Sequence, residues 1–255
     1  MTWTRLVRAE LRKLTTTKMP WAFLAVLVAI SATTGSAVVW GKDFDGTKTF
    51  ISTAADQRSL MAFAANAMVI AGLFGAIAVA REYGHGTVIP TFLSSPHRHR
   101  AVLAQLVAVG LGGAVLGLVG AGLTVAAVAA GLPTTEFGFM VSVAGVARVI
   151  AAAAFAGAVG AVMGAGIGAV VRNTGGAVTA AVLVLIIVPP LVVQLVSDAS
   201  AWVPSPLATA VSGVDPAAAG VESQAGPLAA VVALAAWAIV PATVGLLCVQ
   251  RRDVV

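Results

Sequence analysis

Six long apolar runs constrain what this chain can fold into. A helix needs about 20 residues to cross the roughly 30 Å hydrocarbon core of a bilayer, and none of the six runs contains Asp, Glu, Lys, Arg or His. The runs are Trp21–Trp40, Ser59–Ala80, Ala101–Ala130, Val149–Val171, Gly175–Val196 and Pro227–Val249. Only 10% of the residues are charged, whereas a soluble domain has about 25%. We therefore expect an all-α polytopic membrane protein with six transmembrane helices.

The basic residues are divided unequally among the segments between these runs. With the N-terminus in the cytoplasm, eleven Lys and Arg residues lie on the cytoplasmic side and four, Lys42, Lys48, Arg58 and Arg148, on the other side. Short cytoplasmic loops are enriched in Lys and Arg, so this division predicts that both termini are cytoplasmic. It also accounts for the net charge of +5 without a basic patch, and we expect no nucleic-acid partner.

Residues 1–19 have an amphipathic helical pattern. At helical spacing, one stripe is apolar and the opposite side carries Arg5, Arg8 and Arg12. The apolar stripe consists of Trp3, Leu6, Val7, Leu11 and Leu14. This pattern predicts a helix in the membrane interface with its basic side towards anionic headgroups. Glu10 falls within the apolar stripe, so it either tilts to the interface or meets a partner such as Lys13.

A cleaved signal peptide is the alternative interpretation of the N-terminus. A basic start followed by an apolar run is typical of such a peptide. The first apolar run, however, reaches spanning length and no clear A-x-A cleavage site follows it. We therefore expect the first run to be retained as a transmembrane helix.

Glycines at four-residue spacing predict close helix contacts. The third run contains Gly113 and Gly117, and the fourth contains Gly160, Gly164 and Gly168. Without side chains, such faces let two helices approach closely in lipid. We expect packing within one subunit in preference to a dimer interface.

Prolines and a long connection mark the last third of the chain. Pro189 and Pro190 are predicted to kink or end the fifth helix, and Pro241 to interrupt the sixth. Residues 197–226 lie between these helices and are moderately apolar. We expect a short interfacial or re-entrant element there, on the outer face.

The apolar runs lack the side chains of catalysis. Without Asp, Glu or His they offer no general acid, general base or metal ligands, and the P-loop pattern GxxxxGK[ST] is absent from the chain. The nearest approach, at 35–43, has the wrong glycine spacing and an Asp where Ser or Thr is required. We expect a protein that is not an enzyme and holds no metal or cofactor of its own. Energy for any uphill transport would come from another polypeptide.

The polar stretch between the second and third runs, residues 81–100, is predicted to be cytoplasmic. Gly84 and Gly86 would end one helix, and Thr87 would cap a short helix that runs to about Ser94. The apolar residues of that short helix are Val88, Ile89, Phe92 and Leu93. A short amphipathic helix either lies on lipid or fills a groove in a partner. A solvated surface turn is the alternative.

Three sequence pieces at these positions resemble one family. They are AELRKL at Ala9–Leu14, REYGHGTVIPTFLSSPHRHR at Arg81–Arg100, and LLCVQRRDVV at Leu246–Val255. Within a six-span frame, they resemble the permease subunits of bacterial ABC-2 type ABC transporters over nearly the whole chain. One departure is Gln105, where many relatives carry a lysine.

The resemblance implies an exporter in a bacterial cytoplasmic membrane. Two permease subunits, identical or related, would form the pathway, and two separate ATPase subunits would bind ATP and Mg²⁺ beneath them. The residues implied to contact the ATPase are Glu10, Glu82, Thr87, Val88, Ile89, Phe92 and Leu93. Two alternatives stay open: a membrane anchor or sensor that recruits a cytoplasmic partner without transport, and an ion-coupled carrier. The carrier is disfavoured because such proteins place ionisable residues at mid-membrane.

Overall fold

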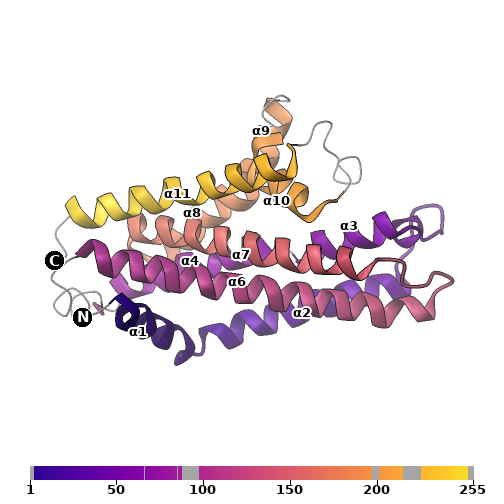
Figure 1. Cartoon of the computed structure of the whole chain (residues 1–255), viewed down its shortest axis with the longest axis horizontal. Helices are drawn as coiled ribbons and strands as arrows, with labels where there is room; N and C mark the ends of the chain where they lie inside the picture. The colour runs from indigo at the N-terminus through magenta and orange to yellow at the C-terminus, as the bar shows by residue number, and fades with distance from the viewer. Residues whose placement is uncertain are drawn as a thin grey trace.

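The computed structural model describes residues 3–65, 67–84, 86–87, 98–196, 201–214 and 225–251. These ranges are almost entirely helical and contain no strand. Six helical segments are long and apolar enough to span a membrane. The predicted all-α fold with six membrane-spanning helices is therefore confirmed. In Figure 1 the long helices lie side by side in an elongated bundle.

Most of the helix boundaries lie close to those of the predicted runs. Two spans consist of more than one element: α3 and α4 form the second, and α8, η3 and α9 form the fifth. The elements in chain order are α1 (Trp3–Thr15), α2 (Met19–Trp40), η1 (Thr49–Ile51), α3 (Ala54–Ala65), α4 (Ala67–Gly84), α6 (Arg98–Gly131), η2 (Leu132–Thr134), α7 (Val143–Val171), α8 (Thr174–Val182), η3 (Leu183–Ile187), α9 (Val188–Leu195), α10 (Pro204–Ser212) and α11 (Pro227–Arg251). At 34 residues, α6 is about 51 Å long. It therefore exceeds the thickness of a bilayer core, as its long apolar run predicts.

The helix α7 is at the centre of the bundle. It contacts α4, α6 and α11, and it lies between α6 and α11 in Figure 1. Its N-terminus is capped by Ser142, whose hydroxyl accepts a hydrogen bond from the amide of Gly145 at 3.1 Å. Many of its residues are small and buried, with Met163 among the largest side chains that are fully buried. Because these side chains are small, neighbouring helices can pack close to the backbone of α7.

All five glycines singled out in the sequence lie at helix–helix contacts within the chain. A side chain on Gly160, Gly164 or Gly168 of α7 would meet the backbone of α4. A side chain on Gly113 or Gly117 of α6 would meet the backbone of α7. The two glycine faces therefore pack α7 against two different neighbours.

The prolines of the fifth helix kink it and do not end it. The fifth helix does not end at Pro189 and Pro190 but continues to Leu195. Proline cannot donate to the carbonyl four residues earlier, and the preceding turn, Leu183–Ile187, is a wider π-helix. In Figure 1, α9 leaves the direction of α8. The predicted kink is therefore present, and the predicted end is not.

Pro241 does not interrupt the last helix, so that prediction is wrong. The helix α11 runs from Pro227 to Arg251 with Pro241 inside it. A side chain on Gly166 of α7 would overlap with the backbone at Pro241. Because Gly166 has no side chain, α7 packs directly on α11 at this point. That contact supports the helix where proline removes a hydrogen bond.

Two exposed tryptophans mark the ends of α2. Trp21 is 69% exposed and Trp40 is 78% exposed. Trp40 is 19 positions after Trp21, which corresponds to a helical rise of about 28 Å. This distance is close to the thickness of a bilayer core, at whose two interfaces Trp is enriched. The positions of the two side chains thus agree with a membrane-spanning α2.

The end of the bundle away from α1 is held by a buried glutamine. The Gln57 side chain is fully buried, and its amide nitrogen donates to the carbonyls of Ile51 at 3.1 Å and Gly138 at 2.9 Å. Its oxygen accepts from the amide of Met140 at 3.0 Å. One side chain therefore connects two loops that are distant in sequence. Gln57 precedes the predicted second span, which begins at Ser59, so this role was not predicted from the sequence.

The predicted element between the last two spans includes a short helix. This helix is α10, and it packs against α7 and α11. It ends at Gly213, whose φ of 72° is in the left-handed region that glycine adopts readily. Trp237 of α11 donates its ring N–H to the carbonyl of Trp202, 3.0 Å away, just before α10. Residues 197–200 and 215–224 lie outside the described part of the chain.

Candidate functional site at the junction of α1 and α4

The helix α1 has the amphipathic arrangement that its sequence predicts. Leu6 and Glu10 are buried, whereas the three arginines Arg5, Arg8 and Arg12 are exposed. The helix packs against α6, and Leu14 contacts the buried cluster that includes Phe74 of α4. The apolar side of α1 therefore packs on the bundle at Leu6 and Leu14, whereas Trp3 of the same stripe is 44% exposed. The basic side faces away from the protein.

Lys13 joins α1 to the end of α4. Its ammonium nitrogen lies 2.7 Å from Oε1 of Glu10 and 3.3 Å from Oε1 of Glu82. The two carboxylate side chains are only 8% and 15% exposed, and the Lys13 side chain is 39% exposed. Glu10 thus has the partner that its place in the apolar stripe requires. Glu82, 69 residues further along than Lys13, shares that partner.

The two carboxylates keep Lys13 charged. Burial of the Lys13 side chain lowers its pKa, but attraction to Glu82, together with the hydrogen bond and charge of Glu10, raises the pKa by more. The net effect is a pKa above the usual value of 10.5. At neutral pH Lys13 is therefore an ammonium that lies between the carboxyl groups of Glu10 and Glu82.

Thr87 adjoins this cluster. Its hydroxyl donates to the carbonyl of Glu82 at 3.3 Å. Three of the residues expected to contact a partner, Glu10, Glu82 and Thr87, are thus near one another at one end of the bundle. The other four fall outside the described residues. These four are Val88, Ile89, Phe92 and Leu93. The predicted short helix after Thr87 also lies outside the described residues.

Arg172 ties three helices at the same end of the bundle. It ends α7 in the left-handed conformation, with φ of 58°, and its Nη2 donates to the carbonyl of Cys248 in α11 at 3.2 Å. Its guanidinium carbon lies 5.2 Å from the centre of the Tyr83 ring in α4, within the range of a cation–π contact. In the sequence Arg172 is one of the eleven basic residues of the predicted cytoplasmic side, and these contacts were not predicted from it. The sequence signal for such contacts is an isolated arginine directly after an apolar run.

Exposed cations are concentrated at this end. They lie on α1, on the connection to α2, at the start of α6 and at the end of α11, and they are Arg5, Arg8, Arg12, Lys18, Arg100 and Arg251. The opposite end has Lys42, Lys48, Arg58 and Arg148. The Lys and Arg residues, which are unequally divided among the loops in the sequence, are therefore also unequally divided between the two ends of the bundle.

No group of three His, Cys, Asp or Glu residues in the described ranges is arranged to hold a metal ion. The two carboxyl groups of the ion cluster lie within a surface that is otherwise basic. Comparison with known proteins adds no relative, since no family model matches the chain and no curated protein matches its sequence.

Proposed function

We propose that this chain is the membrane-spanning permease subunit of an ABC exporter in a bacterial cytoplasmic membrane. The observation that carries the proposal is the position of Lys13. It joins the interfacial helix α1 to the end of α4, directly before the segment 87–93 that resembles the ATPase-contacting loop of the family. A partner that moves this segment would therefore move α4 and α1 together.

Two further features support this function. The six apolar runs contain no Asp, Glu, Lys, Arg or His, so a coupling ion has no carboxylate to bind within them. The chain also lacks a P-loop, so a separate polypeptide would supply the ATPase activity. The basic end of the bundle, with α1 and Arg172, would face the cytoplasm.

The mechanism follows from how the junction is connected. ATP-driven closure of the partner would push on residues 87–93. The backbone carries this push to Glu82, whose carbonyl accepts from Thr87, and Lys13 passes it to α1. α4 would respond by shifting against α7, its main neighbour in the bundle. A second permease subunit, identical or related, would complete the pathway.

Purification of the tagged protein from its own membranes tests this proposal. The complex is expected to contain a stoichiometric P-loop ATPase whose activity is measurable after reconstitution. Replacement of Phe92 and Leu93 by Asp is expected to remove the ATPase from the complex while membrane insertion is unchanged. A charged residue cannot replace an apolar one in a desolvated groove without a large penalty.

A matched pair of substitutions controls for general damage. Phe139 and Met140 are likewise adjacent and apolar in the sequence. They are 43% and 46% exposed and lie at the opposite end of the bundle. Replacing both by Asp is expected to leave the ATPase bound. The proposal would be overturned if the wild-type chain purified without an ATPase. Recruitment of a partner without ATPase activity would favour the membrane anchor or sensor instead.

A further inference from the structure

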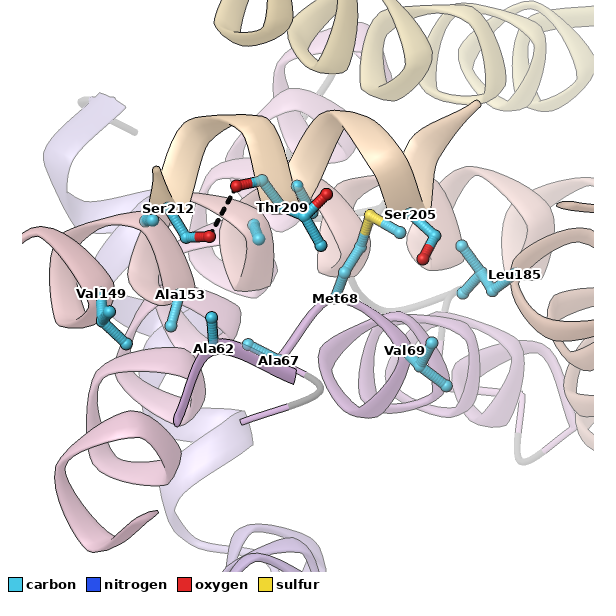
Figure 2. A pocket seen from close by; sticks show the side chains of 13 residues that line it. Ala62, Ala67, Met68, Val69, Val149, Ala153, Leu185, Ser205, Thr209 and Ser212 are labelled. Atoms are coloured by element: carbon cyan, nitrogen blue, oxygen red, sulfur yellow. Dashed lines mark hydrogen bonds between the residues drawn. The ribbon is translucent and has the colours of Figure 1, made fainter. Parts of the chain in front are cut away.

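A small pocket lies near the end of the bundle that is distant from Lys13. Its volume is about 100 Å³, and Figure 2 shows α10 on one side of it with Met68 and Ala67 on the other. The lining residues come from α3, α4, α7, η3 and α10. They include Met68, Ala153, Leu185, Ala208, Thr209 and Ser212.

Two irregular elements meet at this pocket. Leu185 belongs to the π-helical turn of the fifth span, and the serine and threonine side chains belong to the short helix α10. A π-helical turn inside a helix is often found at a functional site. Within a membrane, irregular backbone is tolerated where it is buried in protein or lines a cavity. The pocket is thus placed where the regular helix packing is interrupted.

The size of the pocket limits what it can hold. An apolar cavity of about 150 Å³ accommodates benzene, with its six carbon atoms. A pocket of about 100 Å³ therefore fits a group of about four heavy atoms. The flexible side chain of Met68 can adjust to the shape of such a group. The pocket would hold one end of a larger molecule rather than the whole of it.

The chemistry of the wall selects an uncharged group. Of the described residues that line the pocket, none carries a charge, and burial of an unpaired charge there would be costly. The hydroxyl of Thr209 donates to the carbonyl of Pro206 at 2.7 Å, and that of Ser212 donates to the carbonyl of Thr209 at 2.6 Å. Their protons are therefore used within α10. Each oxygen can only accept a hydrogen bond from a ligand.

We infer that this pocket is a binding subsite for an uncharged, hydroxyl-bearing aliphatic group of the transported molecule. The aliphatic part contacts the alanines of α7, and the hydroxyl donates to Thr209 or Ser212. This inference assigns a substrate class to the proposed function. That the bound molecule is transported rests on the proposed function. The binding preference itself is a property of this chain alone.

Cysteine labelling tests the preference without an ATPase. In a Cys248→Ser background, which removes the single native thiol, Ala153→Cys places a thiol in the pocket wall. Three methanethiosulfonate reagents transfer S-propyl, S-hydroxyethyl or S-aminoethyl groups, each with four heavy atoms. The rate at which each reagent labels the protein thiol is divided by the rate at which the same reagent reacts with 2-mercaptoethanol in solution. Ala208→Cys, on the α10 side, is a second labelling position in case one variant does not fold.

The expected order is hydroxyethyl, then propyl, then aminoethyl. A hydrogen bond to α10 should favour hydroxyethyl over propyl by about threefold, and the charge should slow aminoethyl by at least about tenfold. Combining Thr209→Val with Ser212→Ala should remove only the preference for hydroxyethyl. Phe44→Cys, in an exposed loop, should show no preference between hydroxyethyl and propyl.

Three results would overturn the inference. They are equal rates for hydroxyethyl and propyl, aminoethyl as fast as the neutral reagents, and no labelling at either pocket position. A failure here leaves the copurification of an ATPase unaffected. Conversely, a chain that purifies without an ATPase can still show the labelling order. The two proposals therefore fail separately.

Discussion

The guanidinium of Arg172 lies over the ring of Tyr83, with 5.2 Å between its central carbon and the ring centre. The same side chain donates to the carbonyl of Cys248, so the last turns of α11 are held to α7 and α4. Tyr83 directly follows Glu82, which places this contact beside the Lys13 cluster. The two clusters together fix the positions of four helices at one end of the bundle.

Arg172→Gly is expected to loosen the end of α11. Glycine accepts the left-handed φ of 58° at this position without strain, so only the side-chain contacts are lost. A hydrogen bond from a charged group contributes about 1–2 kcal/mol here, which corresponds to roughly five- to thirtyfold in a local opening equilibrium. The rate of maleimide labelling at Cys248, the only cysteine, should rise by that factor. Arg251→Ala removes an exposed cation from the same helix and should leave the labelling rate of Cys248 nearly unchanged. Equal labelling rates in the two variants would contradict the role of Arg172.

Gly164→Ala is expected to destabilise the contact between α7 and α4. A Cβ at this position would overlap with the carbonyl oxygen of Gly72, so the two helices must move apart. Overpacking of this kind costs about 1–3 kcal/mol, and the midpoint of thermal unfolding in mild detergent should fall.

Gly122→Ala in α6 is the matched control for this substitution. A Cβ there would meet no atom within 4 Å, and alanine favours a helix over glycine by up to about 1 kcal/mol. Its unfolding midpoint should equal or exceed that of the wild type. If both variants unfolded at the same temperature, the close backbone contact at Gly164 would be wrong.

Gln57→Leu is expected to release the loop that contains Met140. The substitution leaves the amide of Met140 and the carbonyls of Ile51 and Gly138 without their partner. Loss of these bonds should cost about 2–4 kcal/mol. Hydrogen exchange at the Met140 amide should become faster. Gln194→Leu, an exposed position on α9, should not change that rate, and slow exchange in both variants would refute the assigned bonds.

Lys13→Met is expected to weaken the attachment of α1. It leaves the buried Glu10 and the largely buried Glu82 without the ammonium that both of them contact. Because Lys13 itself is partly exposed, the cost is about 1–2 kcal/mol rather than that of a fully buried pair. Limited proteolysis within α1 should become faster. Arg8→Met, on the exposed side of the same helix, is the control and should resemble the wild type.

The contribution of Lys13 is also expected to disappear at high pH. Its pKa in the folded protein is above the usual value of 10.5, so the folded state favours the ammonium form. The stabilisation is therefore complete below 10.5 and is lost as the pH rises through the higher pKa of the folded state. The difference in unfolding midpoint between the wild type and Lys13→Met should be constant near neutral pH and shrink above 10.5. A difference that shrank between neutral pH and 10.5 would contradict the ion pairing.

Periodicity and charge were sufficient to predict the elements of this fold. The six spans follow from the length of the apolar runs, and the exposure of Arg5, Arg8 and Arg12 follows from helical spacing in α1. These are properties of one segment at a time. The glycine spacings likewise predicted that Gly160, Gly164 and Gly168 share a face. The partner helix of that face, α4, could not be read from the spacing.

Contacts between distant segments were beyond the reach of these patterns. Lys13 was considered as a partner of Glu10, three residues away, but its contact with Glu82 depends on how α1 lies across the bundle. Gln57 was missed because the second span was started at Ser59, on hydropathy alone. The π-helical turn before Pro189 was missed because the way a helix accommodates proline depends on its neighbours.

The close backbone contact between α4 and α7 has a mechanical consequence. Interdigitated side chains lock two helices in register, because sliding would drive one row of side chains over another. At Gly72 and Gly164 the two helices meet backbone to backbone, so no side chain locks the register at this point. With its 18 residues, α4 is a rod of about 27 Å, with Met68 at the pocket and Glu82 beside Lys13. A displacement of one end of α4 therefore moves the other end as well.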